Sequence, residues 1–311
     1  MTSKIEGTKI LRCRKCGKTK EGVHLRSYNL NICLDCFLDF FRKRVKETIE
    51  KFKMFSLKDK VAVAISGGKD STALARVLKD LGYNITLFHI NTGIERENYA
   101  KDSQKSVEEF AKRENLPLKI LYFKDEIGID IKVAAKISKK EICGVCGMIK
   151  RYLLNREAKD FDVIVTGHTV DDEAASLLSS FIFWKEFINR QWPVLKEEET
   201  LKKRAKPLTL CFEKETRLFC QILNLPFNPN PCPLRGGTYV FFKKFIHKLE
   251  EEMPSSVLNF YKGFLKRKRK MGFEFEPQKL NPCQKCGYLT VAQVCNFCKL
   301  KEKIEKLKEK S

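Results

Sequence analysis

Residues 60–81 constrain the fold more than any other part of the sequence, because they predict a strand, a tight turn and a helix in succession. Residues 60–65 form a short apolar run rich in β-branched side chains, which is typical of a buried strand. Apolar side chains then recur at helical spacing over residues 71–81. Gly67 and Gly68 allow a sharp turn between the two patterns. The segment therefore predicts one unit of an α/β fold, with a loop that opens onto a helix start.

The composition of this loop predicts a phosphate site. Amides at a helix start, a lysine charge and two serine hydroxyls all favour an anion. The loop is not a Walker A motif, because Val63 stands where that motif has its first glycine and Asp70 where it has its magnesium-binding hydroxyl. An ordinary Gly-Gly turn is the alternative. It would explain the sharp turn of the backbone but not the polar side chains of the loop. The residues expected to bind ATP here are Ala64, Ser66, Gly67, Gly68, Lys69, Asp70 and Ser71.

The loop sequence, residues 66–71, resembles the PP-loop signature of the N-type ATP pyrophosphatases. In that superfamily the loop holds the pyrophosphate end of ATP while a nucleophile attacks the α-phosphate. The resemblance implies an adenylating enzyme that releases pyrophosphate rather than ADP. It also implies magnesium on the ATP phosphates, held by Asp70 or Asp172.

The charge of the chain favours a polyanionic partner. The formal net charge is +22 and the pI is about 9.4, so nucleic acid is the first candidate, although a lysine-rich solvated surface gives the same numbers. The tail at 299–310 is more simply an amphipathic helix. No segment has the length of a membrane span or the apolar core of a signal peptide, so we expect a cytoplasmic protein. One solid basic run is expected to grip an RNA backbone: Lys266, Arg267, Lys268, Arg269 and Lys270.

Thirteen cysteines in such a chain indicate metal sites rather than disulfides. Eight of them form CxxC pairs near the two ends, and two such pairs supply the four thiolates of a structural zinc ion. Free or redox-active cysteines are the alternative. The first expected zinc group is Cys13, Cys16, Cys33 and Cys36, and the second is Cys283, Cys286, Cys295 and Cys298.

A fifth pair, Cys143 and Cys146, has no second CxxC nearby. Spacing alone leaves a redox pair, a partial metal site and two buried cysteines as open interpretations. One cysteine from elsewhere would complete three ligands, and a cubane iron–sulfur cluster held that way keeps one iron open. Cys232 lies in a proline-rich loop, whereas packing is the default role of Cys211 and Cys220.

Nearly the whole chain resembles the tRNA 2-thiouridine synthetases of the TtuA type. The resemblance is carried by the loop at 66–71, the terminal cysteine groups and the segments 143–178, 204–208 and 231–264. It implies a [4Fe-4S] cluster on Cys143, Cys146 and Cys232. It further implies catalytic roles for Lys150, Asp172 and Asp171, and ATP contacts from His89, Ile90, Gly167 and Asp172. From the residues alone, Asp171 and Asp172 fit first-turn helix acids equally well, and His89 fits a core position.

The family's reaction is the adenylation of a tRNA uridine at its C2 oxygen, followed by sulfur insertion at C2. The neighbourhood of residues 235–238 favours the T-loop uridine 54 over the wobble uridine 34. The alternatives are wobble thiolation by the same chemistry, an amidating or lysidine-forming ligase, and a non-catalytic zinc-finger RNA-binding protein. The resemblance leaves the sulfur donor open between free sulfide and a ubiquitin-like thiocarboxylated carrier protein. Homodimers are common in this family.

These patterns predict an α/β architecture of the PP-loop ATP pyrophosphatase (adenine nucleotide alpha hydrolase-like) type, with a zinc finger at each end. The expected units are an N-terminal zinc finger at 1–38, a catalytic domain at 39–272 and a C-terminal zinc finger with a basic tail at 273–311. Strands are expected at 60–65, 84–90, 117–123 and 162–166, with a parallel sheet. We expect helices at 37–55 and 247–270.

Overall fold

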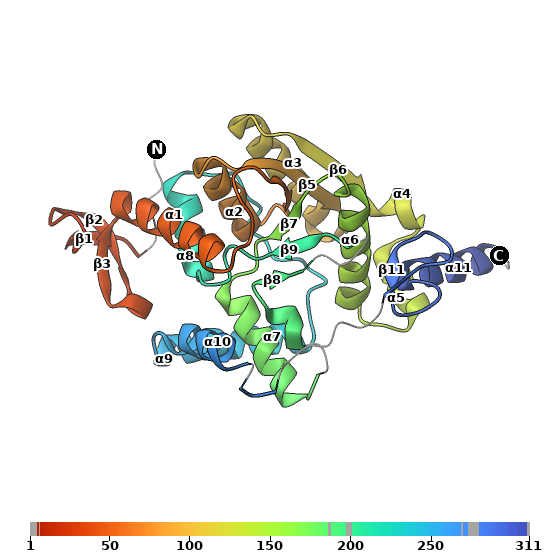
Figure 1. Ribbon diagram of the computed structural model, residues 1–311. Coiled ribbons are helices and arrows are strands. Elements are labelled where there is room, and N and C mark those ends of the chain that lie inside the picture. The colour runs from red at the N-terminus through yellow and green to blue at the C-terminus, as the bar shows by residue number, and fades with distance from the viewer. Residues whose placement is uncertain are drawn as a thin grey trace.

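A central sheet with a cysteine-rich module at either end organises the molecule (Figure 1). The computed structural model describes residues 5, 7–185, 188–196, 201–268, 270–272 and 280–309. The strand order is β6-β5-β4-β7-β9-β8, and every neighbouring pair is parallel except β8 with β9. The strands are β4 (Lys60–Ala64), β5 (Asn84–Asn91), β6 (Leu118–Tyr122), β7 (Val163–Thr166), β8 (Val194–Leu195) and β9 (Lys203–Ala205).

All four predicted strands are confirmed, and the sheet is mostly parallel. The strands β8 and β9 were not predicted, because two or three residues are too few to display an alternating pattern. The helices of the structure are α1 (Leu34–Lys51), α2 (Lys69–Asp80), α3 (Tyr99–Glu114), α4 (Phe123–Ile127), α5 (Ile131–Ser138), α6 (Ile142–Glu157), α7 (Val170–Ile182), α8 (Glu213–Ile222), α9 (Thr238–Glu252), α10 (Ser256–Arg267) and α11 (Asn296–Lys308). Three short 3-10 turns are η1 (Arg26–Tyr28), η2 (Arg96–Asn98) and η3 (Ile188–Gln191). Within the described residues, no helix has the length and apolar character that crossing a membrane requires.

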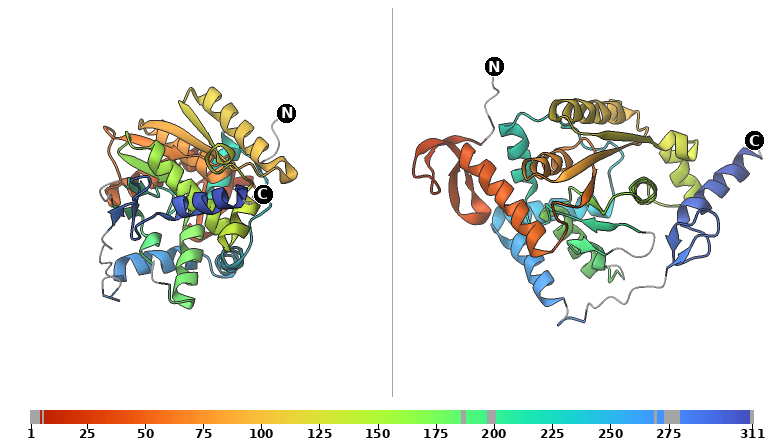
Figure 2. Two further views of the ribbon diagram at one scale, coloured as in Figure 1. Left: turned by 90° about the vertical axis from the view of Figure 1, so that its right-hand side faces the viewer. Right: turned by 45° about the horizontal axis from the view of Figure 1, so that its top comes forward.

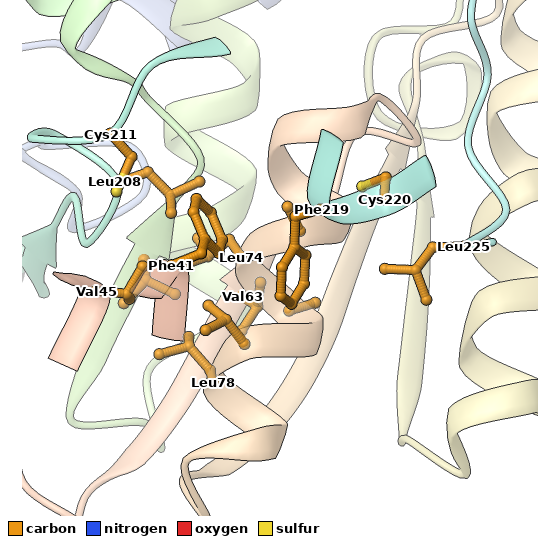
Figure 3. Packing of buried hydrophobic residues seen from close by; sticks show 14 of the residues in the cluster. Phe41, Val45, Val63, Leu74, Leu78, Leu208, Cys211, Phe219, Cys220 and Leu225 are labelled. Carbon is orange, nitrogen blue, oxygen red and sulfur yellow. The ribbon is translucent and has the colours of Figure 1, made fainter. Parts of the chain in front are cut away.

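Both faces of the sheet are buried, as parallel sheets require. Val61 and Val63 of β4 belong to the core beneath α1, α2, α3 and α8, whereas Ala62 belongs to a separate cluster with residues of α6 and its C-terminal end. Figure 3 shows Val63 beside Leu78 of α2 and near Phe219 of α8. This two-sided burial explains why β4 is apolar at every position after its first residue.

The N-terminal module is built into the main core. Its antiparallel sheet consists of β1 (Lys9–Arg12), β2 (Thr19–Leu25) and β3 (Leu30–Cys33), and α1 follows directly. Phe37 and Phe41 of α1 are fully buried in the same cluster as β4 and α2. The expected boundary between residues 38 and 39 therefore falls inside one continuous helix that anchors the module.

The C-terminal module packs against the opposite end of the protein (Figure 2). It contains β10 (Asn281–Pro282), β11 (Leu289–Thr290) and the amphipathic helix α11, which confirms the helix expected in the tail. Leu300 and Ile304 are buried against α5 and α6, and Phe297 stacks on Tyr152 of α6 with ring centroids 3.8 Å apart. The expected boundary at 272/273 adjoins residues 273–279, which lie outside the described residues.

The single helix expected at 247–270 is wrong, because two helices occupy this region. The helix α9 ends at Glu252 and α10 begins at Ser256. Between them lies Pro254, which has no amide hydrogen and whose ring clashes with the preceding helical turn. Ser255 has a φ of 75°, so the chain turns sharply there. The turn lets α9 and α10 both pack on α7 as a separate apolar cluster.

Candidate active site and metal centres

The phosphate loop lies where the order of the sheet reverses. From β4 the chain adds β5 and β6 on one side and then returns to add β7 on the other. In open α/β sheets, ligands bind beyond the carboxyl ends of the strands at such a switch point. The predicted loop follows β4, and Gly167 follows β7. A Cβ at Gly167 would lie 2.9 Å from the backbone of Asp70 and Ser71, so the two loops touch as only glycine permits.

The phosphate loop is held in shape before any ligand enters. Gly67 has a φ of +87°, and a Cβ there would lie 2.6 Å from the carbonyl oxygen of Ser103. The hydroxyl of Ser71 accepts from the amide of Ser66 at 3.0 Å and lies 3.1 Å from the carbonyl oxygen of Gly68. These contacts close the loop at the start of α2, where its amides and the helix dipole favour an anion.

A small cavity of about 70 Å³ lies beside the loop. It is lined by Ala64, His89 and Ile90, as expected of an adenine site, and by Lys150. The Nδ1 of His89 lies 3.0 Å from the carbonyl oxygen of Ile65, while its Nε2 is buried and has no partner among the described residues. Burial lowers the pKa of His89, so the ring is neutral. Because Nδ1 donates, Nε2 is left as an acceptor on a residue that lines the cavity.

A second, polar cavity of about 450 Å³ adjoins the first. Lys69, Asp70, Asp172 and Cys232 line it. The two cavities share three lining residues, which are Ser66, Tyr99 and Ser103. The structure therefore brings the base cavity, the phosphate loop, a carboxylate and a predicted cluster cysteine to one opening.

The structure separates the two neighbouring aspartates. One carboxylate oxygen of Asp172 accepts from the amide of Thr169 at 2.9 Å and caps α7, while its other oxygen faces the cleft. Asp171 instead accepts from the amide of Glu213 at 2.9 Å and lies 3.4 Å from His247 Nε2. Asp172 thus combines the capping and cleft-facing positions, whereas Asp171 holds the start of α8 and does not line the described cavity.

Burial and neighbouring charged groups give the carboxylates of the cleft different pKa values. Burial alone raises the pKa of Asp172, but Lys243 and His168 outweigh it and hold that pKa well below its usual range. Burial likewise opposes ionisation of Glu213, yet His247 and Lys243 lower its pKa to about 2. The pKa of Asp70 is raised by burial and by the charges of Glu213 and Asp172, against the attraction of Lys69. An ionised Asp172 beside a phosphate loop has the chemistry of a magnesium ligand.

Two residues that contact Asp172 were missed from sequence. The Tyr239 hydroxyl donates to Asp172, and Lys243 Nζ lies 2.5 Å from the same oxygen and also contacts Glu213. Both belong to α9, and the Lys243 side chain is only 9% exposed. A signal was present in the sequence, because Tyr239, Lys243 and His247 recur every four residues and form a polar stripe along one face of α9.

The three expected cluster cysteines surround one end of α6. Cys143 and Cys146 occupy its first two turns and Lys150 the next, while Cys232 comes from the loop after α8. Cys143 Sγ lies 3.9 Å from the carbonyl oxygen of Leu234, two residues beyond Cys232. Burial opposes charge on Lys150, but Cys146, Tyr99 and Cys232 raise its pKa above the ordinary value. Three thiols from two segments beside the cleft are a donor set that fits a [4Fe-4S] cluster.

The two terminal cysteine groups have the geometry of zinc sites. In each group the four sulfurs lie within 4.8 Å of one another. Cys16 and Cys33 have sulfurs 3.8 Å apart, and Cys286 and Cys295 have sulfurs 3.7 Å apart. A tetrahedral ion with Zn–S bonds of about 2.3 Å places its sulfurs roughly 3.8 Å apart. The residues present therefore fit one zinc ion in each module.

The expected RNA-binding run caps α10. Lys266 and Arg267 end the helix and are exposed, as is Lys270. Lys268 Nζ lies 3.8 Å from the ring centroid of Trp192. Arg269 lies outside the described residues.

The loop at the switch point and the two joined cavities define an ATP-utilising PP-loop protein. Residues 40–183 match the PP-loop domain family. The chain is 40% identical over 307 residues to the tRNA-5-methyluridine(54) 2-sulfurtransferase of Thermotoga maritima, covering 97% of this chain and 99% of that protein. It is 33% identical to the Pyrococcus horikoshii protein of the same name, covering 93% of each. The chain belongs to the PP-loop tRNA 2-sulfurtransferase family.

A solved structure supports the same assignment of fold. The U34-tRNA thiolase NcsA from Methanococcus maripaludis, with its [4Fe-4S] cluster, matches with a TM-score of 0.79 and 27% identity. The match covers 94% of this chain and 95% of that protein. The predicted fold, with its PP-loop core, is confirmed.

Proposed function

We propose that this protein is a tRNA 2-sulfurtransferase that adenylates uridine 54 and replaces its C2 oxygen with sulfur. The observation that carries the proposal is the meeting of two cavities at Ser66, Tyr99 and Ser103. One cavity suits the adenine of ATP, and the other joins the phosphate loop to Cys232. A uridine that is activated by ATP in the first cavity would therefore lie next to the sulfur-transfer site in the second cavity.

Different residues bind ATP and carry out the adenylation step. His89 and Ile90 bind adenine, and the loop amides with Lys69 hold the pyrophosphate end of ATP. Asp172 holds magnesium on the phosphates, and Asp171 fixes α8 beside it. The C2 oxygen of uridine attacks the α-phosphorus and pyrophosphate leaves. Sulfur then attacks C2, and AMP leaves with the original oxygen.

Lys150 and the three cysteines supply the second half of the reaction. Cys143, Cys146 and Cys232 would hold a [4Fe-4S] cluster, which would supply an iron without a protein ligand as a site for sulfur. Lys150 lines the base cavity and lies in the field of the same thiols, so its ammonium stabilises negative charge that develops at the reacting uridine.

Position 54 is favoured over position 34 by the relatives. The protein from Thermotoga maritima is named for position 54 and matches at 40% identity over 99% of its length. The cytoplasmic tRNA 2-thiolation protein 1 of Caenorhabditis elegans matches at 33% and is covered over 77%. Wobble-uridine thiolation is the alternative, and it uses the same cleft.

Zinc ions in the terminal groups complete the cofactor set. They stabilise modules too small to hold a large core of their own. A cytoplasmic location fits a chain in which eleven of the thirteen cysteines are assigned to metal groups rather than disulfides. The sulfur donor is sulfide or a thiocarboxylated carrier protein. Thiolation assays with each of the two as the sulfur source distinguish them. Sedimentation velocity tests the homodimer.

The deciding experiment is thiolation of unmodified tRNA by anaerobically prepared protein, followed by mass mapping of nuclease fragments. We expect 2-thiouridine at position 54, with AMP and pyrophosphate formed in proportion. Cys232→Ser should abolish thiolation, whereas Cys211→Ala, which alters a buried thiol of the main core, serves as the matched control. Full thiolation by Cys232→Ser under strictly anaerobic conditions would refute the proposed chemistry, and thiolation at position 34 would refute the position.

A further inference from the structure

A third cavity, of about 510 Å³, lies beside the cleft and has no part in the proposed chemistry. It is bounded by α7, by the turn that follows α7 and by η3, and its described lining residues are Ser176, Ser179, Ser180, Trp184, Lys185, Arg190, Gln191 and Tyr239. No aspartate or glutamate occurs among these lining residues. Hydroxyls, an amide, two cations and one indole therefore surround the space, which is the donor set of a nucleotide site rather than of a metal or an acyl chain.

Trp184 is the exposed aromatic platform of this cavity. Its side chain is 85% exposed, which is unusual for so large an apolar group unless a partner covers it. The residue has a φ of 47°, and the turn is held by hydrogen bonds from the amide of Trp184 to the carbonyl of Phe181 and from the amide of Lys185 to the carbonyl of Ser180. A non-glycine residue is uncommon in this left-handed conformation. The backbone turn thus places Trp184 at the edge of the cavity.

Positive charge accompanies the indole. Lys185 Nζ donates to Ser179 at 2.8 Å, which uses one of its three hydrogens and anchors the ammonium beside the cavity. Arg190 also lines the cavity. Trp192 follows Gln191 of the lining, and Lys268 of the basic run lies against its ring. The basic run therefore contacts the segment that lines the cavity.

The cavity is also next to the reacting centre. Tyr239 lines it and donates its hydroxyl to Asp172, which lines the phosphate cleft. Ser176 is one helical turn after Asp172, so the two cavities begin about 6 Å apart along α7. They share no described lining residue, and Tyr239 stands between them.

We propose that this cavity, which we call the Trp184 pocket, binds an unpaired nucleotide of the RNA substrate that flanks the target uridine. The base stacks on Trp184, the serine hydroxyls meet the ribose, and Lys185 with Arg190 bind the phosphate. The proposal rests on the proposed function, because it takes tRNA as the ligand. It explains how a uridine can be held out of its loop, since its neighbour is held as well.

The test uses intrinsic fluorescence, because the chain contains two tryptophans. In a Trp192→Phe background, Trp184 is the single reporter, and an RNA stem-loop that corresponds to the tRNA T-arm should quench it on binding. Trp184→Ala should weaken binding of a labelled stem-loop by roughly ten-fold to one hundred-fold, the range expected for loss of one stacked base. Trp184→Tyr should restore most of the affinity. Leu57→Ala, which also truncates an exposed apolar side chain, is the matched control and should bind normally.

The outcomes separate this proposal from the proposed function. Wild-type protein that thiolates tRNA, with Trp184→Ala binding RNA as tightly as wild type, would overturn the Trp184 pocket alone. If RNA quenches Trp184 and Trp184→Ala binds RNA more weakly, but the wild-type protein does not thiolate tRNA, the Trp184 pocket is supported and the proposed sulfurtransferase function is refuted. A change in sedimentation of Trp184→Ala at unchanged RNA affinity would overturn the pocket and make Trp184 a protein-contact residue.

Discussion

Replacement of Lys243 by methionine is the most informative perturbation of the cleft. Lys243 stands between Asp172 and Glu213, with its Nζ 2.5 Å from the Asp172 carboxylate. Methionine keeps much of the side-chain volume and removes the charge. Both carboxylates would then be left without their shared cation in a largely buried setting.

The expected loss of stability follows from the burial of the three groups. Their side chains are 9%, 11% and 17% exposed for Lys243, Asp172 and Glu213. Breaking a buried ion pair by removing one partner typically costs about 3–5 kcal/mol. Because the cleft lets water reach the carboxylates, we expect the lower end, about 3 kcal/mol. Urea unfolding of anaerobic, zinc-loaded protein measures this free energy.

The pH profile gives an independent readout. The folded pKa of Asp172 is depressed, so its contribution to stability is present above its unfolded value of 3.8 and is lost as pH falls through the folded pKa. In Lys243→Met, burial still raises the pKa of Asp172, but the positive charge that lowered this pKa is gone. The pKa of Asp172 therefore rises. The acid limb of ATP-dependent pyrophosphate release should therefore move to higher pH.

Lys206→Met is the matched control, because Lys206 pairs with Glu173 at 2.7 Å with side chains only 11% and 4% exposed. It removes a similarly buried cation that does not line the cleft. We expect a comparable loss of stability and an unshifted acid limb. An equal shift in both variants, or none in Lys243→Met, would show that Lys243 does not set the ionisation of Asp172.

Three further predictions concern other parts of the protein. Gly67→Ala should weaken ATP binding strongly in a nucleotide titration, because the new Cβ would lie 2.6 Å from the carbonyl oxygen of Ser103. Gly82→Ala is the control, because Gly82 has a similar φ of +81° but open space around it. It should lose only about 1 kcal/mol of stability. Chelation of zinc should raise hydrogen exchange in α11 and α6 together, since both share one core; exchange confined to α11 would contradict this. The pKa of His247 is raised to about 9 by Asp171 and Glu213, so its stabilisation is complete below about pH 6.5 and lost as pH rises through 9; His247→Gln should remove that pH dependence of unfolding.

Local sequence patterns predicted the parts of this protein that short-range physics controls. The loop at 66–71 and its flanking strand and helix follow from turn chemistry and apolar spacing within about twenty residues. The zinc groups follow from CxxC spacing, because a tight turn must aim both sulfurs at one ion. The break at Pro254 was equally local, yet a long apolar and basic pattern concealed it.

The composition of the cleft was decided by packing between distant segments. Spacing could not join Cys232 to Cys143 and Cys146, and the family resemblance supplied that grouping. Sequence also left Asp171 and Asp172 equivalent, because adjacent acids in a first helical turn differ only in direction. Their difference appears when α8 and α9 pack on α7.

The sequence by itself thus determined the PP-loop, the two four-cysteine modules and most of the sheet. The tertiary structure alone decided which carboxylate faces the cleft, that Lys243 pairs with it, and that the Trp184 pocket opens beside it. The physical reason is range. Turns and strand or helix periodicity are fixed over a few bonds, whereas buried charge pairs and pockets depend on the angles at which whole helices meet.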